Sequence, residues 1–507
     1  MDVELIKYQN ADDVPRNRNY KFRIGIRHIQ LLYMFLICGA MGVLRVSPGV
    51  AMLAVTDTSR INDTYIQIKN WDRKTQGVVL YSFFMGYAIM LVPGELFLKR
   101  IGGKYTLAVA LLLNGGLCVA MPTVINKGNV LAVSGMHLFM GMSQACVSPA
   151  NRALLDKWLP PHERSLFGRI IFMGLLLGMI LALPVIGIIS EARLGWELIY
   201  YSLAMMAFSI GAICILLTAN SPNKHQAVGD TEKEYIAVAK NNMEKIVMEN
   251  KERKYQNTNG NITSPPIPWC QILKTSQFWK LAFSHVSSNT VFVFCLSDMP
   301  LYLQNFYPTL RENTSWMAIF YTMWLLMELL GMIASYIYNH FFRWNEIPFR
   351  IVFSFSFIGI TCGLPILPYL IPDWNITAMI TLMTILASLS VQTHAVMKNV
   401  KEMRDMDPGT VLMLTSTIAS LAGACIPLLT GFIIVDKMNM HRWRYLFFTL
   451  MTIVLFCQAA YFILASCSKV SSRNRVKRGY HLTGYDNSSE LLEIKSNHKT
   501  EHEAEKI

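Results

Sequence analysis

The sequence predicts an all-α membrane protein in which twelve transmembrane helices form two six-helix bundles. Hydrophobic residues make up 53% of the 507 residues and charged residues only 16%, whereas soluble globular proteins carry roughly a quarter charged residues. The apolar residues gather in twelve runs of about 20 residues, long enough to cross a bilayer as helices. A polar segment, 219–279, separates the first six runs from the last six.

The apolar runs set the predicted boundaries of the helices and of the larger parts of the chain. The runs lie near 28–55, 77–98, 104–125, 129–150, 167–190, 195–218, 280–303, 316–339, 349–371, 376–397, 408–435 and 442–466. We expect five parts: a cytosolic N-terminus (1–27), an N-terminal six-helix bundle (28–218), a cytosolic central loop (219–279), a C-terminal six-helix bundle (280–466) and a cytosolic C-terminal tail (467–507). Apolar residues at helical spacing predict a surface helix over 231–250 in the central loop.

The distribution of basic residues indicates the orientation of the helices. The net charge is +13, and Lys and Arg cluster before the first run, in alternate turns, in the central loop and in the tail. These segments share the cytosolic side if both termini are cytosolic, as the positive-inside rule requires. The charge therefore reflects topology and does not indicate nucleic-acid binding. We expect a multi-pass protein of the plasma membrane or of a lysosomal or vesicular membrane.

Glycosylation sequons support the same orientation. Asn62, Asn313 and Asn375 begin Asn-x-Ser/Thr sequons in loops that this topology places outside the cell or in a lumen, so we expect glycosylation there. Residues 1–27 lack the short apolar core of a cleavable signal, so the first run is expected to act as a signal anchor. Most of the ten cysteines lie inside the runs and indicate small core residues, not a disulfide framework.

Arg45 is the one formal charge inside the first run, 28–55. Ten residues separate it from Val55, which places it about 15 Å from that end of the helix. An arginine at such depth costs about 2.5–3.5 kcal/mol on the insertion scale, and Pro48 invites a kink beside the charge. Arg45 either snorkels or pairs with a structural carboxylate, or it faces a water-filled cavity and attracts an anion. We favour the second interpretation.

Polar residues recur on single faces of two other runs. His137, Gly141 and Gln144 are spaced by four and three residues in the fourth run, so they share one helix face. Such a face indicates either close helix packing or a wall of the cavity, and the cavity is favoured because large polar side chains need partners in lipid. His285 and Asn289 share a face of the seventh run. Both histidines are alternatives for proton coupling.

Charged residues in the eighth run and after the second run are candidates for coupling and gating. Glu328 lies about 18 Å into the eighth run from Trp316. A lone carboxylate at that depth indicates either ion coupling or a buried structural partner. Lys99, Arg100 and Lys104 flank the glycines of the turn after the second run, where cations can dock on helix ends and latch a closed state.

Motifs throughout the chain resemble one family. They are Val50-Ala51 after Arg45, Trp71, Gln76-Gly77, SFFMGY (82–87), Pro93-Gly94, Arg100 with Gly103-Lys104, Pro149-Ala150, WLPPHERS (158–165), Gly195-Trp196, Ile267-Pro268-Trp269, Pro300-Leu-Tyr302 and VLMLTSTIASLAGACIPLLTG (411–431). With WLPPHERS as the most specific motif, the chain resembles the anion–cation symporter branch of the major facilitator superfamily, which includes sialin, vesicular glutamate transporters and type I phosphate transporters. The resemblance implies a substrate site near the midplane between the two bundles, with Tyr87 in that site and Glu163 and Arg164 in gating.

The chain departs from the family pattern at positions that bear on coupling. An arginine and a glutamate are usual in the fourth helix, where this chain has His137 and Gln144. The glutamate is thought to serve proton coupling in several members, and Gln144 cannot titrate. Glu95 replaces the second glycine of the family's Pro-Gly-Gly, and Thr290 and Val293 replace an aromatic pair in the seventh helix. The resemblance therefore implies the fold and an anionic substrate more strongly than the coupling mechanism.

We predict a secondary active transporter of a small anion (an acidic sugar, a dicarboxylate or amino acid, or a phosphate-like ion), coupled to protons or sodium by alternating access. Arg45 is the main anion anchor, with Tyr87, His137, Gln144 and Asn289 as further substrate-binding candidates. The alternative is a transport-deficient family member acting as a sensor, a trafficking factor or an organelle or pigment-granule factor, which the loss of both helix-four charges favours. Because the sequence contains no ATP-binding loop, metal-ligand cluster or nucleophile–base pair, we expect no enzyme, cofactor or metal. The expected partners are the anion and the lipid bilayer, and the chain is expected to be a monomer.

Overall fold

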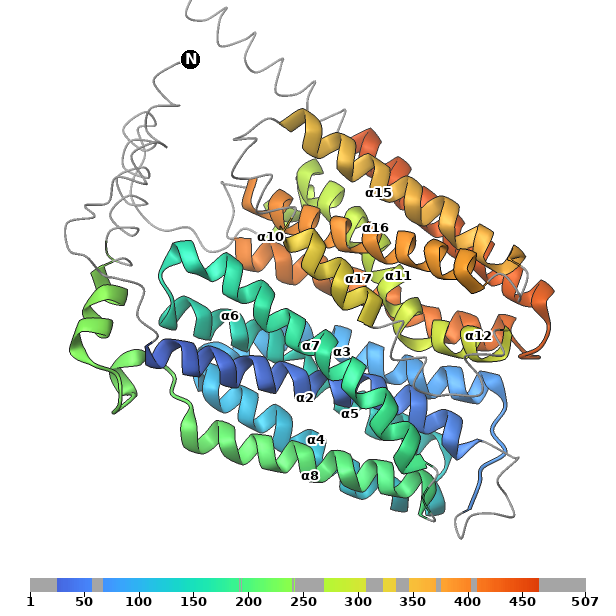
Figure 1. Cartoon of the computed structure of the whole chain (residues 1–507), viewed down its shortest axis with the longest axis horizontal. Helices are drawn as coiled ribbons and strands as arrows, with labels where there is room; N and C mark the ends of the chain where they lie inside the picture. Colours follow the sequence, from blue (N-terminus) through green and yellow to red (C-terminus); the bar gives the residue numbers. More distant parts are fainter. Residues whose placement is uncertain are drawn as a thin grey trace, which may run out of the picture.

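The computed structural model describes residues 25–56, 67–190, 192, 194–238, 241, 269–306, 322–333, 346–370, 375–402 and 408–464. Every regular element in these ranges is a helix, and they contain no strand. The long helices run side by side, with the early part of the chain on one side and the late part on the other (Figure 1). The all-α prediction is therefore confirmed.

The early helices form one group, which we call the N-terminal group. Its members are α2 (Ile26–Val55), α3 (Arg73–Ile101), α4 (Gly103–Lys127), α5 (Val130–Ala145), α6 (Val147–Trp158), α7 (Pro161–Ser190) and α8 (Gly195–Leu217). α2 packs against α7, α3 against α5, and α4 against α8. The α2–α7 contact needs a glycine, because a Cβ added to Gly178 would collide with the carbonyl oxygen of Gly39.

The late helices form the C-terminal group. Its members are α10 (Trp269–Lys274), α11 (Ser276–Ser297), α12 (Met299–Phe306), Thr322–Ile333, α15 (Glu346–Ile366), α16 (Asn375–Glu402), α17 (Pro408–Ile433) and Met440–Leu464. α11 packs against α16 and α17, and α15 packs against α16. One apolar core extends through both groups and includes Trp158, Tyr200, Trp324 and Trp443. The boundaries assigned to the five parts of the chain stay predictions.

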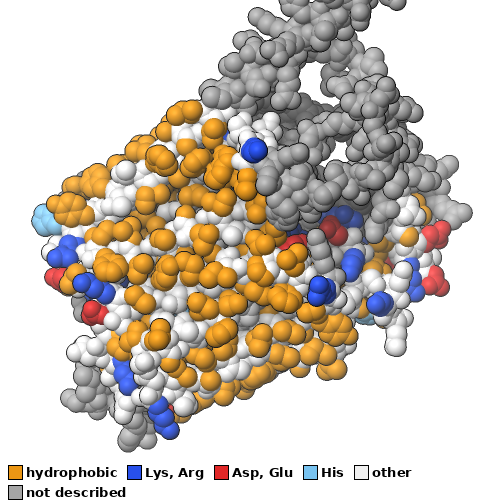
Figure 2. All heavy atoms as spheres, turned by 180° about the vertical axis from the view of Figure 1, so that it is seen from behind, with side chains coloured by type: hydrophobic (Ala, Val, Ile, Leu, Met, Phe, Trp, Pro, Cys, Tyr) orange, Lys and Arg blue, Asp and Glu red, His pale blue; other side chains and the backbone are white. Residues whose placement is uncertain are grey.

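The described helices have the length and surface of a membrane protein. Eight are long and apolar enough to cross a membrane: Ile26–Val55, Arg73–Leu98, Gly103–Lys127, Val130–Trp158, Leu166–Ile186, Gly195–Leu217, Gly409–Ile433 and Met440–Leu464. Thr322–Ile333, Phe355–Tyr369 and Ile376–Gln392 are shorter apolar helices in the regions of three further predicted spans. Apolar side chains cover the face seen in Figure 2, and charged side chains gather at its edges. An apolar surface of this extent belongs in contact with lipid.

Three predicted helix boundaries differ from the structure. The fourth run is broken at Cys146, between α5 and α6. Pro149 in the first turn of α6 has no amide hydrogen to donate to the carbonyl oxygen of Ala145, which explains the break. α11 begins at Ser276 instead of 280, because the polar residues Ser276 and Gln277 at its start lie outside the apolar run. Of the surface helix predicted over 231–250, the structure describes a helix over 230–238.

The two groups touch chiefly through α3 and α17, and Gly77 of α3 meets Pro427 and Gly431 of α17 at one end of the molecule. We call this the distal end; it holds Val55 of α2 and Arg73 of α3, and the opposite, proximal end holds the start of α2. A Cβ added to Gly77 would lie 2.7 Å from the carbonyl oxygen of Pro427 and 3.2 Å from Cα of Gly431. The two helices therefore meet backbone to backbone, and a side chain at Gly77 would separate them.

Replacing Gly77 by leucine should open the distal end, because the added side chain favours states in which α3 and α17 are apart. Thr430 on α17 is 0% exposed, so a Thr430→Cys reporter should react about tenfold faster with a membrane-impermeant maleimide once Gly77→Leu is added. Gly116→Leu is the matched control, since nothing lies within 4 Å of a Cβ at that position. Equal labelling in all three backgrounds would show that the α3–α17 contact does not close the distal end.

Candidate functional site

Arg45 lies in the interior of α2, as its place in the first apolar run predicts. The helix continues through Pro48, and the hydroxyl of Ser47 donates a hydrogen bond to the carbonyl oxygen of Val43. The side chain of Arg45 is half-buried. A permanent positive charge therefore lies within a membrane-spanning helix, and its neighbours decide what it can bind.

Two neutral groups hold the guanidinium of Arg45. Its Nε donates to Oε1 of Gln144 on α5 at 3.4 Å, and its Cζ lies 4.7 Å from the ring centroid of Tyr87 on α3. A cation over an aromatic ring is stabilised by about 0.5–2 kcal/mol, but neither contact neutralises the charge. Among the described residues, no hydrogen bond or ion pair occupies Nη1 or Nη2. The terminal edge of the guanidinium can therefore bind an anion.

The contacts of Gln144 continue into α4. Its Nε2 donates to Oδ1 of Asn114 at 3.3 Å. Nδ2 of Asn114 donates to the carbonyl oxygen of Ala110 at 2.8 Å and to Oγ of Ser143. Gln144 and Asn114 are each 1% exposed, so little water competes for these groups. Sequence patterns did not predict Asn114; its one signal is a lone amide side chain within the apolar run 104–125.

His137 lies further towards the distal end than Gln144. It is 0% exposed on α5 and precedes Gln144 by seven residues, which is about 10 Å along the helix. Its Nδ1 lies 3.0 Å from the carbonyl oxygen of Val133, and its Nε2 has no hydrogen-bond partner among the described residues. Gly141, between the two, packs against the Phe83 carbonyl of α3. On the polar face of α5, Gly141 therefore serves helix packing and Gln144 contacts Arg45. Substrate binding by His137 stays a prediction.

Asn289 and His285 lie in the C-terminal group, on α11. Nδ2 of Asn289 donates to the carbonyl oxygen of Ala419 on α17 at 2.8 Å, and Nδ1 of His285 lies 3.4 Å from Oγ1 of Thr415 on the same helix. Both side chains are half-buried. Their described hydrogen bonds connect α11 to α17 and do not reach Arg45. The roles expected for them in binding and coupling stay predictions.

Glu328 is buried within the helix Thr322–Ile333. Its side chain is 5% exposed, and its carboxyl group interacts with the hydroxyl of Ser390 on α16. Ser390 also donates to the carbonyl oxygen of Met327 at 3.2 Å. Glu328 therefore lies between two helices of the C-terminal group. A hydrogen-bonded carboxyl at this position fits both the coupling role and the structural role that the sequence leaves open.

The basic residues of the predicted gating turn lie at the proximal end. Arg100 is exposed, and Nζ of Lys104 lies 5.6 Å from the ring centroid of Tyr105. The side chain of Lys99 lies outside the described residues. The backbone N–H of Lys104 donates to Oδ1 of Asn220 at 2.9 Å, so the start of the central loop satisfies a free amide at the beginning of α4.

Glu163 belongs to a polar cluster that the central loop completes. Its carboxylate pairs with Arg27 of α2 at 3.6 Å, and Cζ of Arg27 lies 4.8 Å from the ring centroid of Tyr235. Glu232 accepts from the backbone N–H groups of Ile26 and Arg27 at 3.2 and 3.1 Å, which places a carboxylate at the positive end of α2. Burial raises the pKa of Tyr235, Glu163 raises it further and Arg27 opposes the shift. Sequence patterns did not predict this cluster beyond Glu163.

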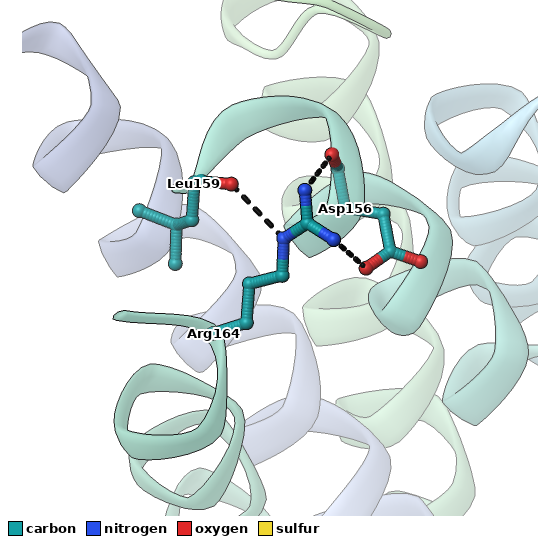
Figure 3. A network of polar contacts seen from close by, with 3 residues as sticks. All are labelled: Asp156, Leu159 and Arg164. Carbon is teal, nitrogen blue, oxygen red and sulfur yellow. Dashed lines mark hydrogen bonds and ion pairs between the residues drawn. The ribbon is translucent and has the colours of Figure 1, made fainter. Parts of the chain in front are cut away.

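Arg164 closes the turn between α6 and α7 (Figure 3). Its Nε donates to the carbonyl oxygen of Leu159 at 3.0 Å, its Nη1 to Oδ1 of Asp156 at 3.0 Å, and its Nη2 to the backbone oxygen of Asp156 at 2.9 Å. The guanidinium thereby caps the last carbonyl groups of α6. These contacts hold the turn within the N-terminal group, and a gating role for Arg164 stays a prediction.

The remaining predicted positions give less structural information. Asn62 and Asn313 lie outside the described residues, and Asn375 begins α16 with a side chain that is also outside them. Glu95, which replaces a family glycine, pairs with Arg152 of α6 at 3.5 Å. In the part of the chain that the structure describes, no group of three His, Cys, Asp or Glu residues could hold a metal ion.

The chain is similar in sequence and in structure to known membrane transporters. The sequence profile of the Major Facilitator Superfamily matches residues 29–406. A Drosophila ananassae protein named "Putative inorganic phosphate cotransporter" is 25% identical over 403 residues, which cover 78% of this chain and 80% of that protein. Human sialin is 27% identical over 408 residues, covering 79% of this chain and 77% of sialin. The inward open structure of the xylose transporter XylE from E. coli shares the fold, with a TM-score of 0.60 at 13% identity over 85% of this chain and 96% of that one.

Replacing Arg164 by lysine should destabilise the proximal end. Lysine cannot reproduce all three hydrogen bonds to α6, because its donors share one nitrogen and lack the spread of the guanidinium fork, so we expect a loss of about 1–2 kcal/mol in the free energy of unfolding. The measurement is the midpoint of thermal unfolding in detergent, with Lys157→Ala, an exposed residue of the same helix end, as control. Equal midpoints for Arg164→Lys and the wild type would contradict a capping role.

Proposed function

This chain belongs to the Major Facilitator Superfamily, and we propose that it carries a small anion across a membrane by alternating access. Its relatives place it in the anion–cation symporter family, a family of transporters and not of enzymes. It is a multi-pass membrane protein. For the substrate we propose a phosphate-like ion, an acidic sugar, or a dicarboxylate or amino acid. The name of the fly relative, an inorganic phosphate cotransporter, supports the first of these.

The observation that carries this proposal is the charge of Arg45. Its guanidinium is half-buried inside α2 and makes its described contacts with an amide and an aromatic ring, both neutral. A buried charge without a counter-ion is costly, and an anion that reaches Arg45 relieves this cost. A guanidinium also matches the two oxygens of a carboxylate or phosphate better than any other side chain. The site therefore favours a small oxyanion.

The contact between the two helix groups supports alternating access. α3 carries Tyr87, which lies under Arg45, and ten residues earlier it carries Gly77, which touches α17 at the distal end. We propose that this conformation is closed distally and admits the anion from the proximal side. The proximal end holds the start of α2 and the central loop, which the positive-inside rule assigns to the cytosol. Both termini are then cytosolic.

Coupling to protons would need a group other than Gln144. We propose Glu328, because it is a buried carboxyl group within the C-terminal group, which moves relative to Arg45 in alternating access. Its hydrogen-bond partner Ser390 lies on α16 of the same group, so movement of that group carries both side chains relative to Arg45. His285 on α11 is the alternative proton carrier, and sodium is the alternative coupling ion.

Arg45→Ala should reduce uptake of the anion at least tenfold, because the site loses its charge and the oxyanion loses charge-assisted hydrogen bonds. Uptake of radiolabelled phosphate, glutamate and N-acetylneuraminate into proteoliposomes, under imposed pH, sodium and voltage gradients, measures the effect. Arg45→Lys should keep part of the activity if a point charge suffices and little if the fork is required.

Arg442→Ala is the matched control for Arg45→Ala. Arg442 is exposed at the distal end and donates to the carbonyl oxygen of Ile433 at 3.1 Å, so its loss removes a positive charge without touching the site. Normal uptake by Arg45→Ala would refute the role of Arg45. Absence of uptake by the wild type under every gradient would favour the sensor or trafficking alternative.

Glu328→Gln should keep anion exchange but lose acceleration by a proton gradient. Glutamine resembles the protonated carboxyl group and cannot release a proton, so the substituted protein stays in one protonation state at every pH. Exchange and net uptake are compared between pH 5.5 and 7.5 in proteoliposomes. Glu197→Gln, which alters a carboxylate bonded to Asn126 at the distal end of α8, should leave the pH dependence unchanged. The same pH dependence in Glu328→Gln and the wild type would assign Glu328 a structural role.

A further inference from the structure

The hydrogen bonds between α4 and Arg45 have a fixed direction. The carbonyl oxygen of Ala110 can only accept, so the side chain of Asn114 must turn its Nδ2 towards it. The second hydrogen of Nδ2 goes to Oγ of Ser143, whose own hydrogen goes to the carbonyl oxygen of Met140 at 2.8 Å. Both acceptors therefore demand the same orientation of the Asn114 amide, and its Oδ1 faces Gln144.

The orientation of Asn114 determines the orientation of Gln144. Because Oδ1 of Asn114 is an acceptor, Gln144 must turn its Nε2 towards α4, which leaves its Oε1 facing Nε of Arg45. The reverse orientation would place an amide N–H₂ against the N–H of a cation, with a donor facing a donor. Both amides are almost fully buried, so water cannot correct such a mismatch at low cost.

We infer that Asn114 is a positioning residue for anion binding: it orients Gln144, and Gln144 holds the Nε edge of Arg45 so that Nη1 and Nη2 face the anion. This inference rests on the proposed function of Arg45. Asn114 itself does not touch the anion and acts through Gln144. An anion bound at Arg45 then uses the terminal edge of the guanidinium, where two parallel N–H groups meet two oxygens of a carboxylate or phosphate.

Asn114→Leu tests the inference, because leucine has a similar volume and cannot hold the Gln144 amide. The measured quantity is the KM for uptake of phosphate, glutamate or N-acetylneuraminate, whichever the wild type transports. We expect KM to rise about tenfold, equivalent to about 1.4 kcal/mol, with the maximal rate per folded protein largely retained. Asn126→Leu is the matched control: it is the same substitution on α4, at an asparagine that bonds to Glu197 at 2.7 Å, and it should leave KM unchanged.

A double-mutant cycle separates positioning from general stabilisation. Gln144→Leu removes the acceptor for Arg45 directly, so Asn114→Leu added to it should change KM less than twofold if Asn114 acts only through Gln144. The inference is overturned if the two substitutions raise KM by factors that multiply in the double variant, or if Asn114→Leu leaves KM unchanged. If Asn114→Leu does not yield monodisperse protein, Asn114→Ser decides the question, because its hydroxyl can donate to Ala110 but is too short to reach Gln144.

Failure of this inference differs from failure of the proposed function. If the wild type transports an anion and Arg45→Ala does not, but Asn114→Leu keeps the wild-type KM, Arg45 remains the anchor and Asn114 is not a positioning residue. If Arg45→Ala transports normally, the proposed function is wrong, and the inference about Asn114 falls with it.

Discussion

The charge of Arg45 inside a membrane-spanning helix is the constraint on which the rest of the site depends. A guanidinium cannot be deprotonated at any physiological pH, so the surrounding helices have to accommodate the charge. They do so with dipoles: the Gln144 carbonyl oxygen on α5 and the ring face of Tyr87 on α3. Dipoles lower the free energy of a buried cation but leave its field uncancelled. A carboxylate at position 144 would neutralise the site, whereas glutamine keeps it positive and available to an anion.

α3 connects this site to the contact between the two helix groups. Tyr87 under Arg45, Gly86 against α5 and Gly77 against α17 all lie on this helix. A helix segment of ten residues is about 15 Å long, so the anion site and the contact with α17 lie about that far apart along α3. α3 is therefore the helix that the site of Arg45 and the contact between the two groups share.

The proximal end of the N-terminal group is held by the central loop. Asn220 bonds to the start of α4, and Glu232 bonds to the start of α2. Helix N-termini carry unsatisfied amide groups and partial positive charge, so a carboxylate or amide oxygen there is stabilising. Tyr235 and Glu163 add contacts with Arg27. The first part of the loop is thus a structural part of the N-terminal helix group, beyond its role as a link between the two groups.

The helices, the position of Arg45 within α2 and the neutral residue at 144 follow from the sequence alone, because hydropathy, helical spacing and residue chemistry are local properties. Only the tertiary structure could decide which polar side chains meet. Arg45 and Gln144 are 99 residues apart, and Arg27 and Glu232 are 205 residues apart. The hydrogen bonds of Asn114 likewise depend on how α4 and α5 are rotated about their axes. Backbone contacts such as those of Gly86, Gly141 and Gly178 set how the helices are rotated and how closely they approach each other. The spacing of residues within one helix does not indicate which other helix these glycines contact.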